Sequence, residues 1–322
     1  MDRAKLIDTL ASAQASRKRP MLTLVNGDTT WLVSVPRPAV SKGKTFYHIL
    51  VDPWLKGHAD VVFSWIIRLQ LKEKAALDSI EAVEDWIREI ETVCGTAEGE
   101  HGRWLDAVLV THTNLDHLHE PSLRTLSPSV QVLAVEDATT MISAMGHFET
   151  ITAVPDFVHG EAWPATPDIP GSLSIFRLQS EGDKYTNLCH AVIIGIPTED
   201  GKSEAILYTP HGIEPESVEA ARKANLDASF LAMLHPLNKC GNMGVVSRGV
   251  VEGLRIERAN SVRHWVNTHD DNLKYSGILS YFMQYGRTTL EQGLEQEAKE
   301  KGEEQRKPNY VVVGNGGGYI LT

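Results

Sequence analysis

Short apolar runs that end in turn-forming residues recur along most of the chain, which is the pattern of buried strands. Residues 21–35 have the pattern of a strand, a turn at Asn26, Gly27 and Asp28, and a second strand. Further apolar runs at residues 46–51 and 105–110 each end beside polar residues. We therefore predict a sheet whose strands carry polar groups at their ends.

Helical spacing of apolar residues alternates with these runs. Residues 1–19 place Leu6, Leu10 and Ala13 on one face. A longer helix is predicted from Asp78, with Asp78 and Glu81 as a capping box and Gly95 just past its end. Further strands are predicted at residues 130–135, 173–178, 188–196, 205–208 and 262–266, and further helices at 137–146 and from about 215. This alternation predicts an α/β fold, specifically an αββα sandwich.

The length of 322 residues allows one large domain or two small ones. We predict an N-terminal helix or arm at residues 1–19 and a single domain over residues 20–322, with a helical insertion at about 56–103. The N-terminal helix is interpreted as a packing helix or as a dimer contact, so a homo-oligomer is compatible with the sequence.

Composition narrows the class of partner. The formal net charge is −11 and the isoelectric point is about 5.6. Nucleic acids and anionic membranes are normally bound by a basic face, so we expect neither as a partner and expect a small-molecule substrate instead. The cysteines Cys94, Cys189 and Cys240 fit no metal or disulfide pattern, which favours a reducing, cytoplasmic location.

Candidate chemistry is concentrated just past the strand at residues 105–110. His112, Asp116, His117 and His119 follow one another closely there. A loop at a strand end can curl back, so that ligands at positions i, i+4 and i+5 converge on one cation such as zinc. The alternative is a surface loop that collects histidines without a function.

The segment THTNLDH resembles the HxHxDH signature of the metallo-β-lactamase fold superfamily, whose members are mostly zinc, manganese or iron hydrolases. His112, Asp116 and His117 match that signature, while Asn114 stands where its second histidine belongs. The segment DPWL, which begins at Asp52, resembles the branch related to L-ascorbate-6-phosphate lactonase. There Asp52 is either an orienting carboxylate for a metal-bound histidine or part of an Asp-Pro turn.

The resemblance implies further ligands and also shows departures from the family. His269 follows a late strand and resembles the family's final histidine, and His211 occupies the place of its bridging aspartate. The family's third-motif histidine is absent from residues 177–180. Asn is a poor zinc ligand and a neutral imidazole cannot bridge two cations, so we predict one divalent metal ion, with zinc first and manganese or iron as alternatives.

The predicted metal ligands are His112, Asp116, His117, His211 and His269, with Asp116 and His112 also as catalytic groups. Asn114, His235 and Asn242 are predicted to contact substrate, the last in a glycine-rich turn before a helix. The sequence predicts a metal-dependent hydrolase that attacks a lactone, ester or related molecule through a metal-bound hydroxide. The alternative is a degenerate, non-catalytic binding protein of the same fold.

Overall fold

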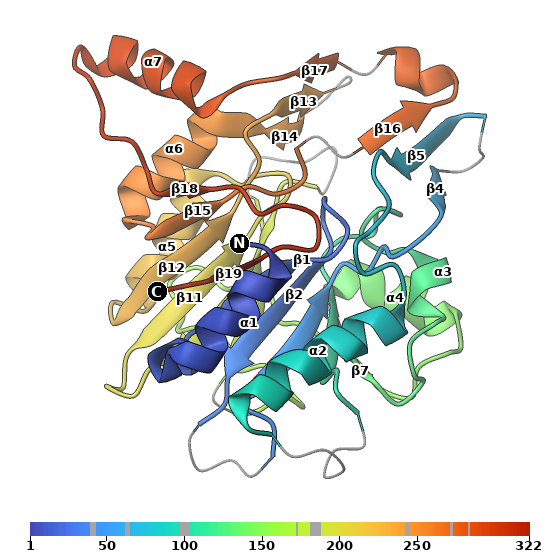
Figure 1. Cartoon of the computed structure of the whole chain (residues 1–322). Coiled ribbons are helices and arrows are strands. Elements are labelled where there is room, and N and C mark those ends of the chain that lie inside the picture. Colours follow the sequence, from blue (N-terminus) through green and yellow to red (C-terminus); the bar gives the residue numbers. More distant parts are fainter. Residues whose placement is uncertain are drawn as a thin grey trace. The chain divides into compact units, whose positions relative to one another are not determined.

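The computed structural model describes residues 1–38, 43–61, 65–96, 103–171, 173–180, 188–241, 245–270, 273–282 and 284–322 (Figure 1). The chain divides into two compact units, and each is described by itself. Unit 1 comprises Met1–Ala153, Asn272–Ser276 and Val313–Thr322, and unit 2 comprises Val154–Asp271 and Gly277–Val312.

The main sheet of unit 1 has the strand order β19-β1-β2-β3-β6-β7-β8. These strands are β19 (Gly318–Ile320), β1 (Met21–Leu24), β2 (Trp31–Pro36), β3 (Phe46–Val51), β6 (Ala107–Val110), β7 (Gln131–Ala134) and β8 (Ile151–Ala153). Strands β3, β6, β7 and β8 are mutually parallel, whereas β19, β1, β2 and β3 pair antiparallel. The residues that follow β3 and β6 therefore meet at one edge of this sheet.

Two helices of unit 1, α1 (Arg3–Ser12) and α2 (Ile80–Cys94), pack side by side (Figure 1). Leu6 and Leu10 of α1 are fully buried, as the helical spacing predicts. Trp86 of α2 is also buried, and its indole N–H donates a hydrogen bond to Thr23 Oγ1 of β1 at 3.1 Å. The remaining helices of this unit are η1 (Gln14–Lys18), α3 (Glu120–Leu123) and α4 (Glu136–Ala144).

The start of α2 differs from the predicted capping box. Ser79 is the N-cap, and its hydroxyl accepts from the backbone N–H of Ala82 at 3.2 Å. Asp78 instead pairs with Lys74 at 2.7 Å. A serine at this place satisfies an N–H of the first turn in the same way as an aspartate, so the predicted helix is right and its cap was placed one residue early. Gly95 ends the helix with φ +94°.

The segment at residues 56–103 contains strands as well as the predicted helix. Strands β4 (His58–Val61) and β5 (Ile67–Leu71) form an antiparallel pair, and β16 (Leu273–Ser276) adds to β5. Buried Trp54, Ala59 and Leu69 form the apolar core beneath this small sheet. Strand β16 lies far along the chain from β5, so the local pattern of apolar residues does not predict that these two strands pair.

The main sheet of unit 2 has the order β18-β15-β12-β11-β10-β9. These strands are β18 (Tyr310–Val311), β15 (His264–Val266), β12 (Ala228–Leu234), β11 (Ser203–Tyr208), β10 (Ala191–Pro197) and β9 (Ser174–Leu178). Strands β11, β12, β15 and β18 are parallel, and β10 pairs antiparallel with β9 and β11. Their carboxyl ends again bring loop residues to one edge.

Helices α5 (Pro215–Ala224), α6 (Gly249–Asn260) and α7 (Leu290–Lys301) belong to unit 2, where α6 contacts both of the others. A Cβ on Gly253 would lie 2.5 Å from the Trp265 ring, so glycine is what lets α6 pack closely onto β15. Strands β13 (Lys239–Gly241), β14 (Val245–Arg248) and β17 (Gln284–Gly286) form a small sheet beside α6, and η2 (Ile278–Phe282) precedes β17. The predicted α/β class is confirmed.

Candidate metal centre

The loop after β6 folds into a tight turn that gathers its polar side chains. The backbone carbonyl of Asn114 accepts from the N–H groups of His117 at 2.9 Å and Leu118 at 2.7 Å. This turn brings Asp116 and His117 back beside His112, and all three are buried. The structure therefore brings together the members of the predicted ligand set that lie in unit 1, and Asn114 is half-buried at the centre of the same turn.

Asp52, directly after β3, lies against this loop. Its Oδ1 accepts from the backbone N–H of Thr111 at 2.7 Å. Its Oδ2 accepts from the Thr111 hydroxyl at 2.7 Å and from Nδ1 of His117 at 2.7 Å. Because a carboxylate only accepts, His117 carries its proton on Nδ1, and Nε2 is then the unprotonated nitrogen. This is the orienting geometry found around metal-bound histidines.

The tautomer of His112 follows from the same contacts. The Thr111 hydroxyl has one hydrogen, which it donates to Asp52, so its oxygen accepts from Nδ1 of His112 at 2.7 Å. Nε2 of His112 is therefore also the unprotonated nitrogen. The two rings lie 4.6 Å apart between centroids, so both imidazoles present the same nitrogen from neighbouring positions.

The donor set fits a divalent cation. Ligand atoms of Asp52, His112 and His117 all lie within 4.8 Å of one another. Both oxygens of Asp52 already accept hydrogen bonds, so we assign Asp52 to orienting His117 rather than to ligation. Oδ2 of Asp116 lies 3.9 Å from Nε2 of His117, so Asp116 is the carboxylate beside the unprotonated nitrogen and is our candidate ligand. Two imidazoles and one carboxylate are zinc-type ligands, with manganese and iron also compatible.

His119 has a structural role despite its place in the histidine-rich loop. Its Nε2 donates to the carbonyl of His58 at 3.2 Å, and its Nδ1 accepts from the Ser122 hydroxyl at 2.8 Å. Burial lowers the pKa of His119, which favours this neutral form. Both ring nitrogens are thus engaged by neighbouring groups of the loop.

In unit 2, His211 follows β11 and His269 follows β15, and the two rings meet edge to face with centroids 5.0 Å apart. His269 has a left-handed backbone, with φ +56°. The next residue, Asp270, accepts from the N–H groups of Leu237 at 2.7 Å and Asn238 at 2.8 Å and so fastens the loop after β12. The parallel strand ends thus bring these two predicted ligands together within their unit.

The residues predicted to contact substrate differ in their surroundings. His235 directly follows β12 and is fully buried; its Nδ1 donates to the carbonyl of Pro236 at 2.7 Å. Burial lowers the pKa of His235 to about 4, so the ring is neutral. Asn242 lies outside the described residues. His264, the first residue of β15, is buried and contacts Asn309 at 2.8 Å.

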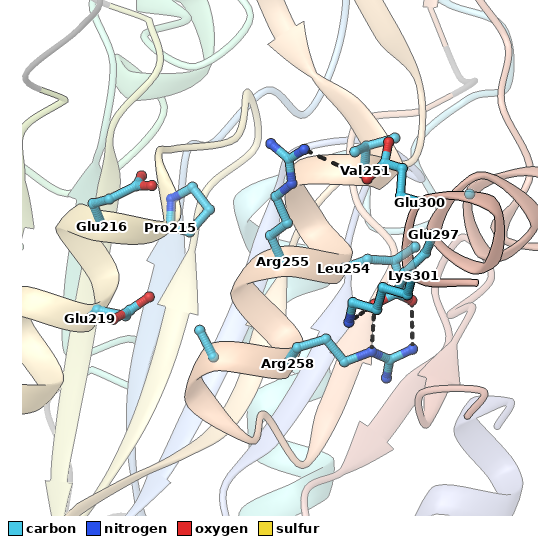
Figure 2. A pocket seen from close by; sticks show the side chains of 12 residues that line it. Pro215, Glu216, Glu219, Val251, Leu254, Arg255, Arg258, Glu297, Glu300 and Lys301 are labelled. Carbon is cyan, nitrogen blue, oxygen red and sulfur yellow. Dashed lines mark hydrogen bonds and ion pairs between the residues drawn. The ribbon is translucent and has the colours of Figure 1, made fainter. Parts of the chain in front are cut away.

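A separate cavity of about 470 Å³ lies on the helices of unit 2 (Figure 2). Glu216 and Glu219 of α5 line it on one side, and Arg255 and Arg258 of α6 line it on another. Arg258 is paired with Glu297 at 3.0 Å. The described lining contains no histidine or cysteine, so the cavity lacks the imidazole donors of the loop after β6.

The sequence interpretation missed Thr111, whose hydroxyl and backbone N–H connect Asp52 with His112. A signal was present in the chain. Asp52 and Thr111 each follow the last residue of a strand, and β3 and β6 pair in parallel with Val51 opposite Leu109. Polar residues directly after two adjacent parallel strands are expected to meet.

Comparison with solved structures identifies similar folds. An isothiocyanate hydrolase from Delia radicum gut bacteria is 13% identical, with a TM-score of 0.58, 94% of this chain covered and 99% of the other. A metallo hydrolase from the archaeon Ignicoccus hospitalis is 14% identical, with a TM-score of 0.51 and coverage of 94% and 99%. CmlA, a diiron β-hydroxylase from Streptomyces venezuelae, is 12% identical, with a TM-score of 0.53 and coverage of 94% and 54%.

Neither a protein-family model nor a curated protein sequence matches the chain. At these identities the structural likeness shows the fold, and the predicted α/β fold of the metallo-β-lactamase type is confirmed.

Among the described residues, no helix combines the length and apolar character needed to cross a membrane.

Proposed function

We propose that this protein is a metal-dependent hydrolase that binds one divalent cation at the loop after β6. The observation that carries the proposal is the hydrogen bond from His117 Nδ1 to Asp52 Oδ2 at 2.7 Å. It fixes Nε2 as the ligand nitrogen and directs it toward the side on which Oδ2 of Asp116 lies. The names of two similar structures, an isothiocyanate hydrolase and a metallo hydrolase, support a hydrolytic reaction.

When bound, a divalent cation lowers the pKa of a coordinated water to about 7 and so supplies hydroxide at neutral pH. The residues of this chain perform the remaining tasks. Asp52 holds the proton on Nδ1 of His117, and Thr111 holds the proton on Nδ1 of His112. Asp116 brings a negative charge beside His117, and its carboxylate can accept a proton during attack on a substrate carbonyl.

His211 and His269 complete the ligand set that the sequence resemblance implies, and their assignment stays a prediction. Zinc is the first candidate for the cation, and manganese and iron are alternatives. The name of one similar structure, a diiron β-hydroxylase, supports iron as an alternative. We propose a lactone, an ester or a related small molecule as substrate. Homo-oligomer formation, a cytoplasmic location and the absence of nucleic-acid and membrane partners also stay predictions.

A non-catalytic binding protein is the less favoured function. Such a protein has no need for two imidazoles with the same protonated nitrogen and a carboxylate 3.9 Å from one ring. A buried polar network of this kind also carries a desolvation cost that an apolar loop would avoid. The donor geometry therefore favours the metal-dependent enzyme.

The test is hydrolysis of a panel of activated esters and lactones by the purified, metal-loaded protein. We expect turnover that disappears with a chelator, returns with metal and is lost in Asp116→Asn. The matched control is Asp106→Asn, because Asp106 lies at the amino end of β6 and pairs with Lys44 and Arg37. Absence of chelator-sensitive turnover across the panel would favour the binding protein instead.

A further inference from the structure

The turn between β1 and β2 is polar and yet buried. Asn26, Asp28, Thr29 and Thr30 are each at most 1% exposed. Oδ1 of Asn26 accepts from the backbone N–H groups of Asp28 at 2.9 Å and Thr30 at 3.0 Å, which sets the shape of the turn. Buried polar side chains are costly unless they are bonded, so their partners indicate what the turn supports.

Thr30 bridges the segment that carries Asp52. Its hydroxyl donates to the carbonyl of Asp52 at 2.7 Å and accepts from the backbone N–H of Trp54 at 2.9 Å. Asn26 adds a bond from Nδ2 to the carbonyl of Trp54 at 3.1 Å. Asp52 itself has a left-handed backbone, with φ +47°, a conformation that persists only when surrounding contacts hold it.

Thr29 contacts the other segment of the centre. Its hydroxyl donates to the carbonyl of Asp116 at 3.2 Å. Two consecutive hydroxyls of one turn therefore hold the backbones of Asp52 and Asp116, residues that lie far apart in the chain. The side chains of those two residues meet His117 at different ring nitrogens, Nδ1 and Nε2.

We propose that Thr29 and Thr30 are positioning residues that fix Asp52 and Asp116 relative to each other around His117. Each threonine bonds a backbone carbonyl, Thr29 that of Asp116 and Thr30 that of Asp52. The inference rests on the proposed metal centre, because the positions of the two carboxylates relative to each other matter for a cation held near His117 Nε2. Thr30 has the larger effect, because it makes two bonds and the one to Asp52 is the shorter.

The test uses Thr30→Val, which keeps the shape and removes the hydroxyl, and Thr30→Ser, which restores it. The control is Thr23→Val, because Thr23 lies in β1 of the same sheet, is equally buried and accepts from Trp86 of α2. Zinc affinity is measured by competition with a chelator, and melting temperature is measured on metal-free protein. We expect Thr30→Val to weaken zinc binding by about tenfold, Thr30→Ser to recover most of it, and Thr23→Val to lower only the melting temperature.

A second readout needs no metal. In ¹⁵N-labelled, metal-free protein, the His117 ring should show a protonated Nδ1 in wild type, Thr23→Val and Thr30→Ser, and a mixture of tautomers in Thr30→Val. If Thr30→Val keeps both the wild-type zinc affinity and the wild-type tautomer, the positioning role is wrong. Failure of wild-type protein to bind zinc, manganese or iron would instead overturn the proposed function, which separates the two outcomes.

Discussion

Among the described residues of unit 1, two carboxylate–histidine pairs, Glu91–His48 and Asp52–His117, have side chains that are all fully buried. In both pairs a ring nitrogen donates to a carboxylate oxygen, at 2.9 Å and 2.7 Å. The two pairs differ in the contact that the second ring nitrogen of each histidine makes. Nδ1 of His48 accepts from the Ser34 hydroxyl at 2.9 Å, whereas Nε2 of His117 faces the carboxylate of Asp116 at 3.9 Å.

The hydrogen-bond partners of the two carboxylates, Glu91 and Asp52, also differ. Glu91 lies on α2 and accepts from the N–H groups of Thr45 and Phe46, which joins the helix to the start of β3. It also accepts from the Thr96 hydroxyl, just past the end of the helix. Asp52 lies at a strand end and joins two loops through Thr111 and His117. The same pair of residue types thus stabilises the packing of a helix in one place and orients a candidate ligand in the other.

Replacing either histidine should have the largest effect, and we expect the two replacements to change different properties. We expect His117→Ala to abolish measurable zinc binding, because it removes a ligand nitrogen. His48→Ala should leave zinc affinity unchanged and lower stability, because it leaves Glu91 buried without its partner, at a cost of about 3 kcal/mol. Chelator competition and urea unfolding on both variants check this, and similar zinc affinities for the two would show that the histidines have been assigned to the wrong roles.

Replacing the carboxylates separates orientation from packing. Asp52→Asn cannot accept from both Thr111 and His117 in the same way, so we expect zinc affinity to fall by about 10- to 100-fold. Glu91→Gln should lower the unfolding free energy by about 2 kcal/mol and leave zinc affinity unchanged. Isothermal titration with zinc measures the first effect, and a wild-type affinity in Asp52→Asn would contradict an orienting role.

Acid stability tests the structural pair alone. Burial raises the pKa of Glu91, but hydrogen bonds from His48, Thr96 and the Thr45 backbone outweigh burial and lower it to about 2, from 4.5 in the unfolded chain. Between these pH values the unfolded state binds more protons, so the contribution of Glu91 to stability is full above pH 4.5 and is lost as the pH falls toward 2, by about 3 kcal/mol. Urea unfolding of metal-free protein should show this slope, and Glu91→Gln should flatten it.

The smallest expected change concerns Asn114, in the turn between the two candidate imidazoles. Asn114→His supplies the residue that the resembling family has at this position, and we expect zinc affinity to rise by a few-fold to about tenfold. His264→Ala serves as the comparison, since that ring lies in the core and should not alter binding. No gain in affinity or stoichiometry would indicate that the turn has lost the family's geometry.

The sequence predicted elements that local pattern specifies. The run at residues 46–51 coincides with β3, because a continuous apolar stretch closed by Asp52-Pro53 has clear ends. It did not predict β13, β14 or β17, because these strands are short and partly polar, and β13 pairs with β17 across more than forty residues. Strands β4 and β5 were missed for the same reason, since β5 is completed by β16.

The same division applies to the candidate site. The grouping of His112, Asp116 and His117 follows from one short loop, so spacing alone predicted it. Which ring nitrogen carries the proton depends on Asp52 and Thr111, whose contact arises only when β3 and β6 pair. The supporting hydroxyls of Thr29 and Thr30 lie in a hairpin turn, where serine, threonine, asparagine and aspartate are common for reasons of turn formation alone.

The most direct test of the central claim is the metal content of the protein as purified and after reloading, measured by elemental analysis together with that of His117→Ala. The proposed centre has donors for a single cation, so wild type should hold about one equivalent. The His117→Ala variant should hold essentially none, and His48→Ala should match wild type. Two tightly held equivalents in wild type, or an unchanged metal content in His117→Ala, would contradict a single cation held through the Asp52-oriented His117.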